Sequence, residues 1–327
     1  MKSNKLLKIL AALCAVVLLA AAWLTPLAQA EQDHVGDGEI SATIKELKIN
    51  WTSGKVHIAY HSGNTIRISE KITGTVSDDM RMRWRVEGDT LTIEYDQPGF
   101  HLFSLAPHEK ELTVTLPERF VLEKANITAT SADLDIPALY ADSVRLKSTS
   151  GDVRAKVTAR TIKGEMTSGD MELQVMSAAE EIKLHSTSGN IILESGWDAG
   201  KTEIETTSGK IQAAVKQTEE FKATSTSGDI HAVLGETKEA KFKSTSGTIL
   251  AEIARMEELE IRSTSGDVTA HLPTAPGFTA RVETASGDFQ HTLPLNKEGK
   301  TYRCGDGSAK VEIHTTSGNI KIAEKAN

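Results

Sequence analysis

The sequence predicts an all-β protein of the β-solenoid or β-helix type, a stack of two-strand repeats of about 20 residues each. Two observations predict this fold. A Thr-Ser-Gly-Asp/Asn phrase returns along the chain, and its glycines follow one another at intervals of 18 to 21 residues through most of the array. Apolar and polar residues also alternate on both sides of each glycine. Such alternation is typical of two short strands with one buried face.

The glycine of each phrase is predicted to occupy the turn between the two strands. Glycine reaches a positive φ without steric cost, and a neighbouring Asp or Asn bonds to nearby backbone in a tight turn. A degenerate copy with Ala132 in the glycine position is expected to be an imperfect first rung. The predicted turn glycines are Gly54, Gly151, Gly169, Gly189, Gly209, Gly228, Gly247, Gly266, Gly287 and Gly318.

The repeats are expected to stack in parallel, with like residues on like. The positions five before and two after each glycine hold mostly aliphatic or aromatic residues throughout the array. Stacked rungs of that kind lie roughly 4.8 Å apart and pair every strand with its neighbours. An antiparallel β-sandwich, with the Ser-Gly-Asp centres as hairpin turns, remains the alternative fold. It would not require a fixed period.

Residues 1–30 are typical of a secretory signal peptide. Three lysines precede an uncharged apolar run at residues 9–24, and Ala28-Gln-Ala30 provides a small-x-small cleavage site. We expect export through a Sec-type signal and cleavage after Ala30, leaving the protein extracellular or at the cell surface. Retention of residues 9–24 as a membrane anchor is the alternative. Removing the three lysines changes the net charge from −8 to −11, which makes nucleic acid an unfavourable partner.

The remaining chain divides into three predicted regions. Residues 31–39 form a polar leader, and residues 40–122 form an irregular N-terminal β region that caps the array. Large side chains suit the closing of an open core, and aromatic residues gather in this cap, including Trp51, Trp84 and Tyr95. Residues 123–327 form the repeat array, with an inserted loop at 294–310 before the last rung.

Several parts of the chain together resemble a known family. They are Trp51-Thr-Ser-Gly-Lys-Val, the strand Glu111-Leu-Thr-Val-Thr-Leu-Pro, the serial Thr-Ser-Gly-Asp-Ile units and the closing run from Tyr302. Over roughly residues 40–325 the chain resembles the bacterial β-strand-repeat domain of unknown function labelled "putative adhesin", also called the toastrack domain. The resemblance implies an envelope-facing protein. Some members are encoded beside envelope-stress signalling systems of Gram-positive bacteria, and the family transfers no catalytic residues.

The sequence predicts neither a catalytic site nor a bound cofactor or metal. Calcium requires six to eight converging oxygens, and the Asp/Asn column after the glycines is interrupted by Lys210 and Thr248. A β-helix polysaccharide lyase or glycosidase needs carboxylates in a cleft built by long loops, whereas these rungs are short. The ten histidines are dispersed without metal-ligand spacing. Cys304 has no partner cysteine once residues 1–30 are removed, and its role stays open.

These features favour an exported, non-enzymatic protein of the cell envelope. Its function would be adhesion or scaffolding against a wall polymer or a surface protein. A membrane-anchored accessory of envelope-stress sensing is the alternative function. A polysaccharide-active enzyme is a third reading and is disfavoured by the absence of long loops.

Overall fold

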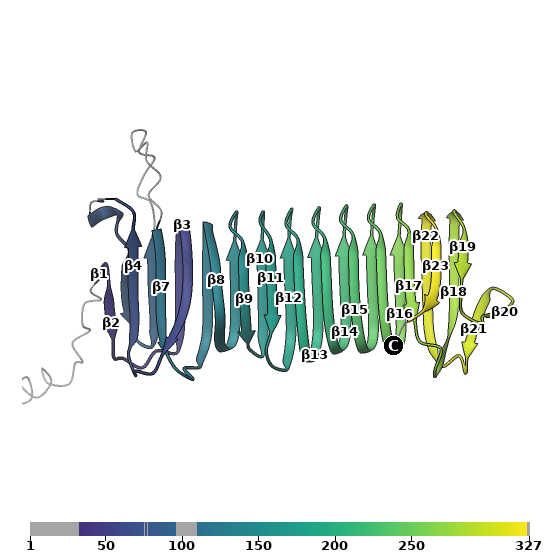
Figure 1. The fold of residues 1–327 in the computed structure, drawn as a ribbon, viewed down its shortest axis with the longest axis horizontal. Helices are drawn as coiled ribbons and strands as arrows, with labels where there is room; N and C mark the ends of the chain where they lie inside the picture. Colours follow the sequence, from purple (N-terminus) through teal and green to yellow (C-terminus); the bar gives the residue numbers. More distant parts are fainter. Residues whose placement is uncertain (1–32, 75, 77, 96–109, 326–327) are drawn as a thin grey trace, which may run out of the picture. The chain divides into compact units, whose positions relative to one another are not determined.

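The computed structural model describes residues 33–74, 76, 78–95 and 110–325 (Figure 1). The predicted signal segment, including its apolar run and cleavage site, lies outside the described residues. The chain from His34 to Asn327 forms one compact unit. The all-β prediction is confirmed, because this unit holds a single hydrogen-bonded sheet of 23 strands. Within the described ranges, the only helical segment is the 3-10 turn Asp78–Met80.

The strands vary from two residues at the ends of the unit to long, bent strands in its centre. In chain order they are β1 (His34–Val35), β2 (Gly38–Ile40), β3 (Glu46–His61), β4 (Ile66–Ile72), β5 (Arg83–Glu87), β6 (Thr90–Tyr95), β7 (Lys110–Pro117), β8 (Leu122–Ser148), β9 (Val153–Thr158), β10 (Thr161–Met166), β11 (Met171–Val175), β12 (Ala179–Ser186), β13 (Ile191–Thr206), β14 (Ile211–Ser225), β15 (Ile230–Ser244), β16 (Ile249–Ser263), β17 (Val268–Leu272), β18 (Gly277–Ser286), β19 (Phe289–His291), β20 (Asn296–Glu298), β21 (Thr301–Gly305), β22 (Ala309–Ser317) and β23 (Ile320–Glu324). The predicted polar leader therefore contains β1 and the start of β2, which pair antiparallel with β5 and β4.

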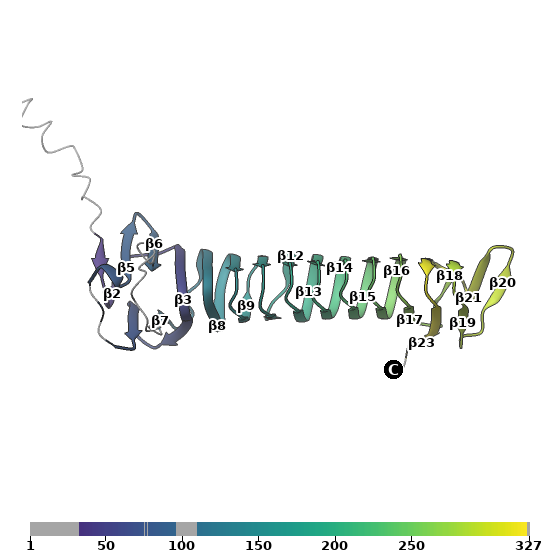
Figure 2. The same ribbon diagram turned by 90° about the horizontal axis from the view of Figure 1, so that it is seen from above.

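The central strands form parallel ladders that pair each residue with its counterpart one repeat later. β14 pairs with β15 from Ile211↔Ile230 to Ser225↔Ser244, and β15 pairs with β16 in the same way. Each strand bends midway, so it contributes to two layers with the core between them (Figure 2). Because the ladders keep one register, apolar residues stack in columns. Ile211, Ile230 and Ile249, for example, pair across three successive strands and are all buried.

The Ser-Gly turns lie at one end of the strands and the bends at the other (Figure 1). We call these lines the turn edge and the corner edge. All ten predicted turn glycines lie in the turn-edge column, but positive φ explains only Gly54, Gly169 and Gly287. At the other seven, a Cβ atom would lie 1.5–2.4 Å from the carbonyl oxygen of the preceding rung. Glycine is therefore required there mainly by close stacking of the rungs.

Two side-chain columns complete the turn edge. The hydroxyl three residues before the glycine accepts a hydrogen bond from the glycine N–H, as Ser225 Oγ does from Gly228 N at 2.8 Å. The Asp or Asn after the glycine accepts a bond from the backbone N–H one rung later, as Asp229 Oδ1 does from Thr248 N at 3.0 Å. The Asp/Asn column is thus a ladder of turn caps. Lys210 N donates to Asn190 Oδ1 in this ladder, but the Lys210 side chain has no acceptor for the backbone N–H of the next rung.

The order of the rungs in space differs from their order in the sequence at the C-terminal end. β22 lies between β16 and β18, and β23 lies between β17 and β19, in parallel on both sides. The predicted inserted loop at 294–310 contains β20 and β21, an antiparallel hairpin whose β21 pairs with β18. The predicted inserted loop thus carries two strands, and the rung that follows it in the sequence lies between two earlier rungs in space. The hairpin covers the backbone groups of an otherwise open edge strand.

The N-terminal end has a similar arrangement. β3 lies between β8 on one side and the β6–β7 rung on the other, and β5 and β4 pair antiparallel with that rung. A buried ion pair joins this cap: Lys110 Nζ lies 3.1 Å from Glu70 Oε1, and neither side chain is exposed. The ammonium also donates to the Met80 carbonyl and lies 3.5 Å from the Tyr95 ring centroid. Burial lowers the pKa of Lys110, so the pairing with Glu70 is what keeps it charged.

Candidate binding surface

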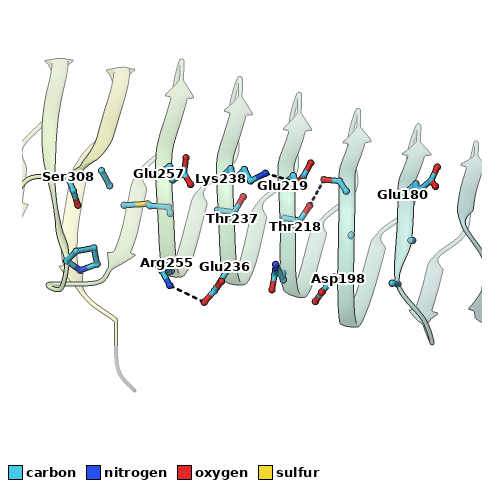
Figure 3. A pocket seen from close by; sticks show the side chains of 18 residues that line it. Glu180, Asp198, Thr218, Glu219, Glu236, Thr237, Lys238, Arg255, Glu257 and Ser308 are labelled. Atoms are coloured by element: carbon cyan, nitrogen blue, oxygen red, sulfur yellow. Dashed lines mark hydrogen bonds and ion pairs between the residues drawn. The ribbon is translucent and has the colours of Figure 1, made fainter.

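A groove of about 860 Å³ runs along the corner edge (Figure 3). It crosses the bends that join β11 to β12 and those within β13 to β16, and it ends against the C-terminal strands at Pro276, Ser308 and Ala309. Each rung supplies the same three positions to it. The repeat therefore forms the groove, and each additional rung makes the groove longer.

The groove has a narrow floor and two polar walls. The floor positions point inward and are small, hydroxylic or apolar: Ala179, Ala199, Thr218, Thr237 and Met256. Thr218 and Thr237 each donate their hydroxyl to the carbonyl two residues later, at 3.0 Å. These bonds occupy the floor hydroxyls and hold the bends, where the ladder skips two residues on each strand. The floor is consequently rigid and offers few free polar groups.

The walls carry most of the charge of the groove. One wall holds Asp198, Gln217, Glu236 and Arg255, and the other holds Glu180, Glu219, Lys238 and Glu257 (Figure 3). Five carboxylates thus face two cations. Arg255 lies 3.7 Å from Glu236, and Lys238 lies 2.6 Å from Glu219. That hydrogen bond raises the pKa of Lys238 and lowers the pKa of Glu219, so both stay charged at neutral pH.

The acidic excess is concentrated toward β12 and β13. Glu180 pairs with Arg160 at 2.6 Å outside the groove. The carboxylates of Asp198 and Glu257 form no ion pair or hydrogen bond with any described residue. Both residues are exposed, so these carboxylates are accessible acceptors. The groove can therefore accept hydrogen bonds or bind cationic groups along its length.

A line of exposed apolar side chains continues the corner edge toward the N-terminus. Its members are Val121, Tyr140, Met176 and Trp197, which are 67%, 37%, 44% and 52% exposed. They include four of the six exposed large apolar residues in the described structure. The register places three of them on nearby bends: Tyr140 pairs with Thr158, Met176 N donates to Val157 O on the far side of the Thr158 bend, and Trp197 lies in the next bend, between Ser195 and Ala199.

The two layer surfaces differ from this edge. The layer holding the first strand of each rung carries ion pairs between rungs, such as Arg145–Glu165 at 2.8 Å and Lys310–Glu258 at 2.8 Å. Paired charges of this kind favour a hydrated surface. On the other layer, Glu252 Oε1 lies 2.8 Å from His231 Nε2. The corner edge combines a groove, unpaired acceptors and exposed apolar groups, so we take it as the candidate site.

Other possible sites carry no comparable arrangement. Over the described ranges, no group of three or more His, Cys, Asp or Glu side chains is placed to hold a metal ion. Cys304 is buried, and burial raises the pKa of its thiol, which disfavours the reactive thiolate. No helix in the described part of the chain has the length and apolar character needed to cross a membrane.

Sequence reasoning missed the groove and the apolar line. Both lie at bends, where rung length varies between 18 and 20 residues and the repeat motif is lost. The available signal was the run Ser195-Gly-Trp-Asp, a large aromatic residue in a segment expected to turn.

Comparison with known proteins identifies the fold. A family model described as Toastrack DUF4097 matches residues 44–252 and 198–323. A "putative adhesin" from Parabacteroides merdae is similar with a TM-score of 0.50 and 14% identity, over 72% of this chain and 95% of that one. For a "putative adhesin" from Parabacteroides distasonis the TM-score is 0.47 and the identity 16%, over 73% and 97% of the two chains. A "putative lipid binding protein" from the same species gives 0.41 and 17%, over 88% and 96%. No curated protein matches the chain.

Proposed function

Because the chain belongs to the Toastrack DUF4097 family, we propose that it is an exported, non-enzymatic protein of the cell envelope. In this proposal it is an adhesin or scaffold that holds a wall polymer or a surface partner. Residues 123–327 would form a β-solenoid, and residues 40–122 its N-terminal cap. The name of the similar structure from Parabacteroides merdae, an adhesin, agrees with this function.

The observation that carries the proposal is the continuous corner edge. Equivalent positions recur there once per rung, roughly every 4.8 Å. A surface of this kind offers an extended polymer the same contact many times, and many weak contacts add up to tight binding. An enzyme would instead need a closed site with perturbed acids or bases. The groove carboxylates are exposed, and their cations are paired with them.

Export rests on the sequence of residues 1–30. A lysine-flanked apolar run with a small-x-small site is the signal for secretion. If residues 9–24 were retained, the array would stand on the membrane and serve a sensing partner there. The two possibilities predict different products in the cell, so the processing of the N-terminus distinguishes them.

The test is fractionation of the producing cells, followed by mass spectrometry of the N-terminus and binding of residues 31–327 to purified wall. We expect a chain that begins at Glu31, is found in the wall or medium, and sediments with wall material. An intact N-terminus in the membrane fraction would favour the anchored sensory accessory. Failure to bind wall or intact cells, with the fold intact by circular dichroism, would overturn the adhesive function.

A further inference from the structure

We propose that the corner edge binds a linear glycan chain, with Tyr140, Met176 and Trp197 against the faces of its sugar rings. The neighbouring groove carboxylates would accept hydrogen bonds from the sugar hydroxyls. This inference rests on the proposed envelope-binding function and names the chemical class of its ligand. It depends on three observations: the presentation of Trp197, the spacing of the apolar side chains, and the charge of the edge.

Trp197 is held outward by an irregularity in the ladder. The pairing of β13 with β14 shifts register between Ser195 and Asp198, because β13 has one residue more than β14 in this bend. The extra residue leaves Gly196, Trp197 and Asp198 exposed in succession. Ser195 Oγ donates a hydrogen bond to the Trp197 carbonyl at 3.1 Å, which fixes the bend. The indole is thus displayed on rigid backbone, as a recognition side chain needs to be.

The apolar side chains lie in a line along the stacking axis. From Tyr140 the bends step through Thr158 and Met176 to Trp197, which is three rungs or about 14 Å. Tyr140 is supported from behind by Tyr60, whose ring meets it edge-on with centroids 5.6 Å apart. Two aromatic rings with the Met176 side chain between them match an extended chain of repeating sugar rings. It does not match a compact ligand.

The surroundings favour a glycan over the other large ligands. The apolar side chains are separated by small polar residues such as Thr158 and Ser177, so they do not form the contiguous apolar core of a protein interface. The edge beyond them is acidic, which opposes binding to anionic lipid surfaces. A pyranose ring has an apolar C–H face and a rim of hydroxyl donors. An aromatic face beside free carboxylates complements both.

Asp198 joins the two parts of the site. It follows Trp197 directly and lines the groove, and its carboxylate forms no ion pair or hydrogen bond with any described residue. A sugar stacked on the indole would therefore have a carboxylate acceptor within the same bend. The groove then continues in the same direction over β14, β15 and β16. A chain bound at Trp197 has a continuous path along the protein.

The experiment uses residues 31–327, which contain the whole compact unit. Of its tryptophans, Trp51 and Trp84 are 2% and 8% exposed, so acrylamide quenching of fluorescence reports mainly on Trp197. The probes are chitohexaose and cellohexaose, with calorimetry as the second readout. We expect saturating hexaose to protect the exposed tryptophan from quenching. Trp197→Ala should weaken hexaose affinity at least tenfold and Tyr140→Ala severalfold.

The control is Val233→Ala, which removes an equally exposed apolar side chain from a layer surface and should leave affinity unchanged. Equal hexaose affinity of Trp197→Ala and the parent protein would overturn the inference. If neither hexaose binds while purified wall does, the glycan assignment fails and the envelope-binding function stands. If neither hexaose nor wall binds, the proposed function itself fails, and the inference with it.

Discussion

Substituting one turn-edge glycine tests the stacking argument most directly, and Gly228→Ala is the most informative change. A Cβ at this position would lie 1.7 Å from the Gly209 carbonyl oxygen, and the φ of Gly228 is not positive. Carbon and oxygen atoms do not approach within 3.0 Å in that way. The two rungs must therefore separate by more than 1 Å at the turn.

The cost follows from the hydrogen bonds that such a separation breaks. Ser227 N and Thr226 N donate to the previous rung at 2.9 and 3.2 Å, whereas the bond from Gly228 N to Ser225 Oγ lies within one rung. Losing the two bonds between rungs, at about 1 kcal/mol each, predicts a fall of about 2 kcal/mol in the free energy of unfolding. Urea denaturation followed by circular dichroism measures this fall. Limited proteolysis reports local opening if the array does not unfold in one step.

Two control variants separate stacking from backbone conformation. Gly196→Ala lies in the Trp197 bend, where a Cβ would meet no atom within 4 Å, and it should leave stability unchanged or raise it slightly. Gly228→Asn should be as harmful as Gly228→Ala, because Asn adopts positive φ but still carries a Cβ. The reasoning is refuted if Gly228→Ala unfolds at the same urea concentration as the parent protein, or if Gly228→Asn is as stable as the parent protein while Gly228→Ala is not.

Three further predictions follow from side-chain contacts. Asp229→Asn should leave the free energy of unfolding nearly unchanged, because Asn keeps the acceptor for Thr248 N. Asp229→Ala should lower this free energy by about 1 kcal/mol in urea titrations. Equal values for the two variants would contradict the ladder of turn caps. Lys110→Met should lower the melting temperature by removing the nearest cation from the buried Glu70, which would keep only Arg81 at 3.7 Å and the backbone N–H of Met82, at a cost of at most about 3–5 kcal/mol. Adding Glu70→Leu should recover most of that loss. The hydrogen bond from His231 lowers the pKa of Glu252. The contribution of this pair to the free energy of unfolding is therefore present above the ordinary glutamate pKa and is lost as pH falls through the lowered pKa of the folded state. Glu252→Gln should reduce this loss of stability at acid pH, as measured by urea titrations between pH 3 and 6.

The sequence predicted an all-β chain and the alternation on both sides of each glycine, because both are local. Ile211, Ile230 and Ile249 pair in register and are buried. The structure places the ten glycines in one column, and positive φ applies to only three of them. A clash with a carbonyl one rung away cannot be seen in a single repeat. Positive φ is the property of glycine that a local sequence suggests first.

The spatial order of the rungs could not be predicted from the repeat pattern. Val268, Ile320 and Phe289 carry similar apolar groups at the same position, so any of them could stack on the next. The chain places Ile320 in the middle. The β20–β21 hairpin pairs with β18, and the chain then returns to place the last rung between two earlier ones. This closes the array with short antiparallel strands, which protect a parallel edge from pairing with other chains.

The same stacking geometry explains why a binding surface would arise on the corner edge. The turn edge tolerates little change, because glycine, a hydroxyl residue and an Asp or Asn each make a defined contact with the next rung. At the bends the ladder already skips residues, and one extra residue in β13 is absorbed without disturbing the rungs on either side. Side chains there can vary from Trp197 to Arg255 while the backbone repeat stays intact. A repeat protein of this design can thus acquire recognition on one edge while the opposite edge maintains the fold.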